Sequence, residues 1–162
     1  MRKIKGTREM FEIIPKRNGQ LPKAPIDKLG GRYGILERFK VGGIGSPKMF
    51  YKGGNEVFDS LSRQISGEET IVNIELLKSG LLVRAYSGQR SKTLGIPFTN
   101  ISAIHILSSS NKEDDTNDKN QIKTIVFELK DHQDIICFVN QKNLSDLIKY
   151  FQKSEFGTLL NV

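Results

Sequence analysis

Residues 70–86 read TIVNIELLKSGLLVRAY, and this pattern predicts a β-hairpin. Apolar residues alternate with polar ones from Val72 to Leu76, as in a strand with one buried and one solvated face. Residues 78–80 end in glycine, which suits the left-handed backbone of a short hairpin connection. Residues 81–86 return as the second strand. We therefore expect an antiparallel sheet to be built on this hairpin.

The pattern continues towards the C-terminus and predicts more strands of the same sheet. Alternating apolar residues over 94–98 indicate a third strand, and Pro97 should confine it to an edge or cut it short, because proline cannot donate a ladder hydrogen bond. The apolar run 101–107 predicts a fourth strand. Residues 125–129 and 135–139 predict a second hairpin. The sheet is therefore expected to be antiparallel.

A loop and one helix account for the rest of the C-terminal half. Residues 108–121 are polar throughout, which predicts a mobile loop. Apolar residues at i, i+3, i+4 and i+7 from Leu144 to Phe151 predict an amphipathic helix through about Lys153, with Asn140 or Asn143 as its N-cap. The fold class is therefore mainly β with one C-terminal helix, which should lie on the sheet.

The first 60 residues have a different character, because they carry all of the excess positive charge. They contain 13 Lys and Arg against 6 Asp and Glu, a net charge of +7, whereas residues 61–162 contain 12 of each. Ten of the 15 glycines and four of the five prolines also lie in this segment, and both residue types disfavour regular structure. The pattern predicts extended chain, with two short exceptions at most: a strand over 10–14, and a helical turn or strand over 35–41.

The predicted strands and helix resemble the pleckstrin-homology-like superfold, in which a C-terminal helix plugs one open corner of a bent antiparallel barrel. Residues 95–104, GIPFTNISAI, resemble the segment that enters the fourth strand in bacterial pleckstrin-homology-like and GRAM-type domains. Residues 123–139 followed by 144–151 resemble their closing hairpin and helix. The resemblance covers roughly residues 68–153. It implies a binding module, because this superfold hosts many unrelated binding functions.

We therefore expect three parts along the chain: an extended basic arm over 1–60, a pleckstrin-homology-like domain over 61–155 and a C-terminal tail over 156–162. About 100 residues suffice for one small core. The charge of the arm favours anionic partners. The function expected is that of a non-enzymatic structural or interaction protein, a subunit of a larger macromolecular assembly such as a ribosomal, chromatin-like or virion particle.

The arm is the predicted contact to RNA, DNA or an acidic protein groove, and the domain would dock on protein partners. Its cations can follow a phosphate backbone, and the aromatic rings between them can stack on unpaired bases. The competing interpretation is a disordered tail that only keeps the chain in solution. The predicted contact residues are Arg2, Lys3, Lys5, Arg8, Lys16, Arg17, Lys23, Arg32, Arg38, Lys40, Lys48 and Lys52.

Two alternatives give the domain a different partner. The first is a peripheral membrane module that binds anionic lipid headgroups through Lys78, Arg84, Arg90 and Lys92. Phosphoinositide-binding members of the family carry a lysine, a spacer, then a basic residue, any residue and an arginine, and here Tyr86 stands where that final arginine would be. The second alternative is a protein-only adaptor or scaffold.

Nothing in the sequence indicates a reaction, a metal or a cofactor. His105 is expected to be a hydrogen-bonded strand residue and His132 lies in a turn, with no motif around either. Cys137 alternates with apolar residues and is expected to be a buried hydrophobe. A single cysteine suits a reducing compartment, no apolar run approaches the ~20 residues of a membrane span, and the charged start is not followed by an apolar leader. We expect the protein in the cytoplasm, or within a virion or nucleoprotein particle.

Overall fold

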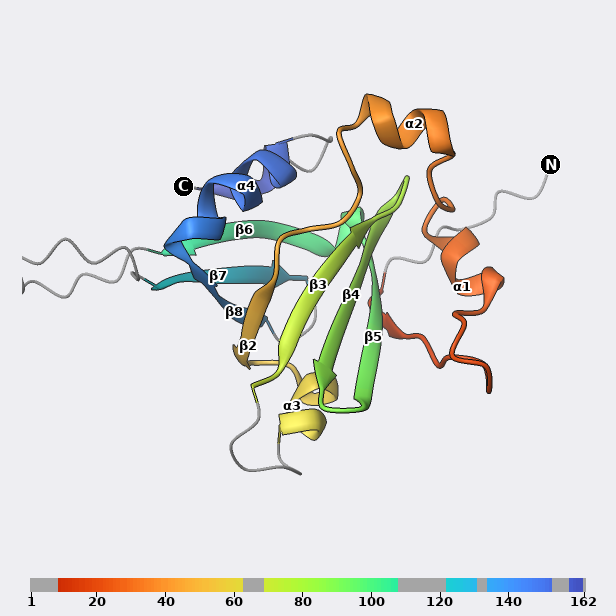
Figure 1. Ribbon diagram of the computed structural model, residues 1–162, viewed down its shortest axis with the longest axis horizontal. Helices are drawn as coiled ribbons and strands as arrows, with labels where there is room; N and C mark the ends of the chain where they lie inside the picture. Colours follow the sequence, from red (N-terminus) through yellow and green to blue (C-terminus); the bar gives the residue numbers. More distant parts are fainter. Residues whose placement is uncertain (1–8, 63–68, 108–121, 131–133, 153–157, 162) are drawn as a thin grey trace, which may run out of the picture.

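The computed structural model shows a mainly β protein (Figure 1) and describes residues 9–62, 69–107, 122–130, 134–152 and 158–161. The strands are β1 (Phe11–Glu12), β2 (Met49–Gly53), β3 (Ile71–Leu76), β4 (Gly80–Ser87), β5 (Arg90–Pro97), β6 (Ile101–Leu107), β7 (Ile122–Leu129), β8 (Ile135–Asn140) and β9 (Leu160–Asn161). The helices are α1 (Lys23–Lys28), α2 (Ile35–Lys40), α3 (Glu56–Ser62), α4 (Gln141–Gln152) and the 3-10 helix η1 (Phe98–Asn100).

The described strands form one sheet in the order β1-β5-β4-β3-β2-β8-β7-β6-β9. Neighbouring strands are antiparallel, except that β9 runs parallel to β6. In Figure 1, β3, β4 and β5 stand upright while β6 and β7 lie across the view, and β2 runs between the two groups. The sheet is therefore strongly bent, and its concave side encloses the core.

The strands and the helix predicted from periodicity are confirmed. The hairpin of β3 and β4 pairs without interruption from Ile71 opposite Tyr86 to Leu76 opposite Leu81. The second hairpin, β7 with β8, and the amphipathic helix α4 lie where the pattern placed them. The third predicted strand, β5, begins at Arg90, earlier than expected, and spans eight residues, so Pro97 ends the strand without shortening it, and η1 follows.

Alternation along the strands places the large apolar side chains on the concave face. Val72, Ile74 and Leu76 are buried in the main core, whereas Asn73 and Glu75 between them face outward and are only partly buried. Helix α4 packs on β7 and β8, where the ring of its Phe151 meets the ring of Phe127 edge-on, with 5.8 Å between centroids. The helix thus covers the half of the sheet that lies across the view in Figure 1.

Residues 9–60 are not the extended arm expected from composition. Strand β2 lies in the middle of the sheet, with Met49 opposite Val72 on one side and Phe50 opposite Phe138 on the other. Met49 and Phe58 are fully buried in the main core. The prediction was wrong because these apolar residues lie on short elements that show no periodicity, and each is buried by partners far away in the sequence.

A second, smaller core holds the preceding segment against the outer face of the β3–β4 hairpin. Ile13, Ile26 and Leu29 are buried there together with Leu77 and Leu82 of the hairpin. The segment approaches the sheet so closely that a side chain has no room at one position of β5. A Cβ at residue 95, a glycine, would lie 2.9 Å from the ring of the phenylalanine at position 11 and 3.0 Å from the side chain of the leucine at position 29.

The expected division of the chain also changes. The boundary between residues 60 and 61 falls inside α3, whose Leu61 is buried in the main core. Residues 160 and 161, placed in a tail, form β9 and pair with β6. Residues 1–8, which include the predicted contacts Arg2, Lys3, Lys5 and Arg8, lie outside the described residues, as do the predicted loop 108–121 and His132.

If residues 9–62 are part of the core, shortening a buried side chain in α3 should destabilise the whole protein. We expect Phe58→Ala to lower the free energy of unfolding by about 3–5 kcal/mol, because the substitution leaves a cavity in the main core. Urea denaturation followed by circular dichroism measures this. The matched control is Phe39→Ala on α2, where the ring is 80% exposed and the change should stay within about 0.5 kcal/mol. Equal, small effects of both substitutions would contradict the integrated core.

Cys137 is a buried member of the main core, as predicted, and this should make its thiol unreactive. Burial raises the pKa of Cys137 from its usual 9.0 to about 12, which lowers the thiolate fraction at neutral pH by about 1,000-fold. We expect 5,5′-dithiobis(2-nitrobenzoate) to react with the native protein at least about 1,000-fold more slowly than with the protein in 8 M urea. Rapid labelling of the native protein, followed by absorbance, would refute this placement.

Candidate functional site

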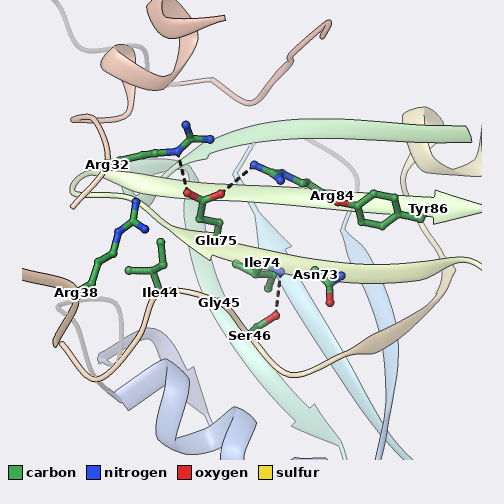
Figure 2. Close-up of a pocket in the computed structure, with 10 residues that line it drawn as sticks. All are labelled: Arg32, Arg38, Ile44, Gly45, Ser46, Asn73, Ile74, Glu75, Arg84 and Tyr86. Carbon is green, nitrogen blue, oxygen red and sulfur yellow. Dashed lines mark hydrogen bonds and ion pairs between the residues drawn. The ribbon is translucent and has the colours of Figure 1, made fainter. Parts of the chain in front are cut away.

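An open pocket lies on the outer face of the β3–β4 hairpin, with a volume of about 530 Å³. Figure 2 shows that two strands form its floor, while the segment that leads into and out of α2 forms its rim. The residues that line it are Arg32, Arg38, Ile44, Gly45, Ser46, Asn73, Ile74, Glu75, Arg84 and Tyr86.

The polar floor of the pocket follows from strand alternation. Asn73 and Glu75 of β3 point to the side opposite Val72 and Ile74, because successive residues of a strand face opposite sides. On β4, Arg84 stands directly opposite Asn73, so it is a diagonal neighbour of Glu75. The same residues that give the hairpin its solvated face therefore supply the charged groups of the pocket.

Residues 44–46, the part of the rim that follows α2, are fixed to β3 by hydrogen bonds of the backbone and of the Ser46 hydroxyl. The Ser46 amide donates to the Ile74 carbonyl over 2.8 Å, and the Ile74 amide donates to the Ser46 hydroxyl oxygen over 2.9 Å. Leu76 donates its amide proton to the Ile44 carbonyl over 2.8 Å. Gly43, with a φ of 101°, lets the chain turn from α2 into this rim. The glycine-rich stretch is therefore an ordered part of the pocket.

The central feature of the pocket is a carboxylate held between two guanidinium groups. Arg32 Nε donates to Glu75 Oε1 over 2.9 Å, and Arg84 Nη2 donates to Glu75 Oε2 over 2.9 Å. In Figure 2 these two arginines lie on either side of Glu75, and Arg38 reaches from α2 with its guanidinium turned towards the pocket. Three arginines and one glutamate leave the lining residues with a formal charge of +2.

Hydrogen-bond donors remain for a further anion. Within the described part of the chain, Arg38 makes one side-chain hydrogen bond, from Nε to the Tyr33 carbonyl over 3.1 Å. Its terminal nitrogens can therefore donate to a ligand. The Nε of Arg84 is buried and has no acceptor among the described residues, which costs on the order of 1–3 kcal/mol. Guanidinium groups with spare donors suit oxyanions such as carboxylate and phosphate, which can accept two hydrogen bonds at once.

The structure brings together residues that the sequence assigned to two different surfaces. Arg32 and Arg38 were predicted as arm contacts and Arg84 as a lipid contact, and all three line this pocket. Sequence analysis missed Glu75 and Asn73. The signal that marks them is their place on the solvated side of the predicted strand 70–76, next to the arginine of the following strand.

The other predicted contacts of the arm that the structure describes, Lys16, Arg17, Lys23, Lys40, Lys48 and Lys52, are not among the residues that line the pocket. Lys48 and Lys52 lie over aromatic rings, 5.4 Å from the centroid of Phe50 and 4.8 Å from that of Phe138 respectively. Four more cations of this set are exposed and are not among the lining residues, namely Lys16, Arg17, Lys23 and Lys40.

The remaining members of the predicted lipid set do not converge either. Lys78 pairs with Glu37 over 3.5 Å, and Lys92 pairs with Glu12 over 3.0 Å. Arg90 is exposed at the start of β5. The four residues therefore do not form one headgroup site around the β3–β4 connection.

His105, the possibility of a metal site and the possibility of a membrane-spanning helix remain to be described. His105 Nε2 lies 2.8 Å from Glu128 Oε2 across β6 and β7, so it is hydrogen-bonded, as predicted. Within the described ranges, no three His, Cys, Asp or Glu side chains gather closely enough to hold a metal ion. No helix in those ranges is long and apolar enough to cross a membrane.

The pocket therefore brings three guanidinium groups and one carboxylate together in one hollow. Guanidinium donors and a net formal charge of +2 would allow the lining residues to hold an anion. No protein-family model, no curated protein and no solved structure matches this chain. Its function has to be inferred from the geometry of the pocket itself.

Proposed function

We propose that the protein is a non-enzymatic docking module of a larger assembly, and that its arginine pocket holds an acidic segment of a partner protein. The observation that carries this proposal is the convergence of Arg32, Arg38 and Arg84 on one pocket with a formal charge of +2. A carboxylate side chain of the partner would accept hydrogen bonds from the terminal nitrogens of Arg38. It would meet guanidinium groups already oriented by Glu75.

The distribution of charge favours an acidic protein segment over RNA or DNA. A nucleic-acid backbone offers one phosphate after another, and binding strength grows with the number of phosphates that a continuous basic track neutralises. Here three arginines, Arg32, Arg38 and Arg84, gather in one pocket that contains a carboxylate of its own. Lys48 and Lys52 are engaged with aromatic rings elsewhere. A local receptor of this kind suits one or two carboxylates better than a chain of phosphates.

The strand order supports the proposed pleckstrin-homology-like fold and hence a binding role. Strands β2 to β5 pair with one another in chain order, as do β6 to β8, and β2 also pairs with β8, where Phe50 lies opposite Phe138. Helix α4 follows the last of these strands and packs on it. A bent barrel with one C-terminal helix is the arrangement that the resemblance implies.

The single cysteine suits a reducing compartment, so we expect the protein to act in the cytoplasm, or within a virion or nucleoprotein particle.

The pocket proposal predicts that Arg38 contributes directly to binding of acidic peptides. We expect Arg38→Gln to weaken binding of a fluorescein-labelled 12-residue polyglutamate peptide by about tenfold or more, because a charge-assisted hydrogen bond contributes about 1.5–3 kcal/mol. Fluorescence anisotropy at constant salt measures the affinity. The control is Arg17→Gln, which removes the same charge from an exposed site that does not line the pocket.

Two outcomes of the same titration would count against the proposal. Equal loss in the Arg38 and Arg17 variants would mean that only net charge matters and that the pocket is not a receptor. Tighter binding of a 12-residue oligouridylate than of the peptide, lost in the Arg38 variant, would favour nucleic acid as the partner of this pocket.

A further inference from the structure

Helix α2 exposes a cluster of large apolar side chains. Ile35, Leu36 and Phe39 are 74%, 77% and 80% exposed, and the other highly exposed large hydrophobic residues of the described chain, Ile14 and Leu107, lie on other elements. Three such side chains on one six-residue helix form a contiguous patch, and exposed apolar patches commonly mark interaction sites.

The patch has cations on both sides. At about 100° per residue, Ile35, Phe39 and Leu36 span an arc of roughly 100° on the helix. Arg38 falls about 60° beyond one edge of this arc, and Lys40 about 40° beyond the other. The helix therefore has an apolar face bordered by positive charge, the pattern of a helix that lies at the surface of an anionic membrane.

The one acidic residue of α2 lies away from the apolar face and is occupied. Glu37 accepts a hydrogen bond from the Gly34 amide over 2.8 Å and pairs with Lys78 Nζ over 3.5 Å. It thus holds Lys78, at the tip of the β3–β4 hairpin, against the helix. Lys78 therefore adds a third cation near the helix, together with Arg38 and Lys40 of α2 itself.

The apolar face lies on a protruding part of the molecule. In Figure 1, α2 sits at the extreme end of the fold, beyond the tip of the β3–β4 hairpin. Arg38 is the residue of α2 that lines the pocket, whereas Ile35, Leu36 and Phe39 do not. Their side chains therefore lie outside the hollow. A protruding apolar surface can enter a lipid layer, while a peptide would need a groove.

We propose that α2 inserts its apolar face into the interfacial layer of a bilayer that contains anionic lipids. Arg38, Lys40 and Lys78 then lie at the level of the headgroups, where each basic side chain gains from the negative surface potential. Membrane attachment of this kind is reversible, because one short helix buries few side chains. It also depends on salt, because salt screens the attraction between the basic side chains and the anionic lipids. The three inserted side chains do not line the pocket, so this inference goes beyond the proposed function.

A second copy of the chain is a less suitable occupant for the patch. A stable protein interface buries about 800 Å² on each partner, which is far more than three side chains on one helical turn provide. The cations at the edges of the patch would also face the same cations of a symmetric partner, and this contact is unfavourable.

The test is sedimentation of the full chain with vesicles made of phosphatidylcholine and 30% phosphatidylserine. We expect the double variant Leu36→Ser with Phe39→Ser to lose binding by at least about tenfold, since both side chains would have entered the lipid. Ile14→Ser is the matched control, because Ile14 is equally exposed but lies outside α2, and it should bind like the original protein. Vesicles of phosphatidylcholine alone should bind much less of every variant.

Three results would overturn the inference. They are absence of binding to the anionic vesicles, equal binding by the double variant and the original protein, and a dimer in size-exclusion chromatography with light scattering that dissociates in the double variant. The polyglutamate affinity of the double variant should stay unchanged, because neither residue lines the pocket. Vesicle binding without polyglutamate binding would support the membrane inference and refute the proposed function. Polyglutamate binding without vesicle binding would support the proposed function and refute the membrane inference.

Discussion

The backbone pairing of β2 with two strands is the constraint on which the rest of the structure depends. Without it, β3 and β8 would each present an unpaired edge, with amide and carbonyl groups open to pairing with other chains. With it, the two halves of the sheet become one bent surface around one core. Because β2 belongs to the basic N-terminal segment, that segment cannot leave the domain. Its charges are part of the folded surface from Lys16 to Lys52.

The pocket is a direct consequence of this integration. Residues 42–46 lead into β2 and are bonded to β3, so the chain just before them, which carries Arg32 and Arg38, must cross the outer face of the hairpin. There it meets Glu75 and Arg84. Tyr150 of α4 helps to fix residues 42–46 in place, because its hydroxyl donates a hydrogen bond to the Ile44 carbonyl over 2.8 Å. Helix, sheet and rim thus hold the arginines in place.

The sequence predicts the C-terminal two thirds of the fold well because its strands are long enough to show a period. Six residues of β3 suffice to separate a buried from a solvated face. The N-terminal segment offers no such signal, since Met49 pairs with Val72, 23 positions later, and Phe50 pairs with Phe138, 88 positions later. Its glycines suggested flexibility, yet Gly30 and Gly43 have positive φ values that ordered turns require. Because the path of the N-terminal segment over the sheet has no sequence signal, the sequence also does not indicate that Arg32 and Arg84 share the carboxylate of Glu75.

Charge asymmetry keeps its importance, but its physical meaning changes. On a free arm, the cations would change position independently of the domain. On a folded surface they create a fixed field, so an approaching anion is oriented before contact. Arg38 lies where this field serves two surfaces, because it lines the pocket and borders the apolar face of α2. A partner in the pocket and a lipid layer against α2 would each attract the same guanidinium. If both proposals hold, binding on the two sides would be coupled through the side chain of Arg38, and by thermodynamic reciprocity each ligand would change the affinity for the other by the same factor.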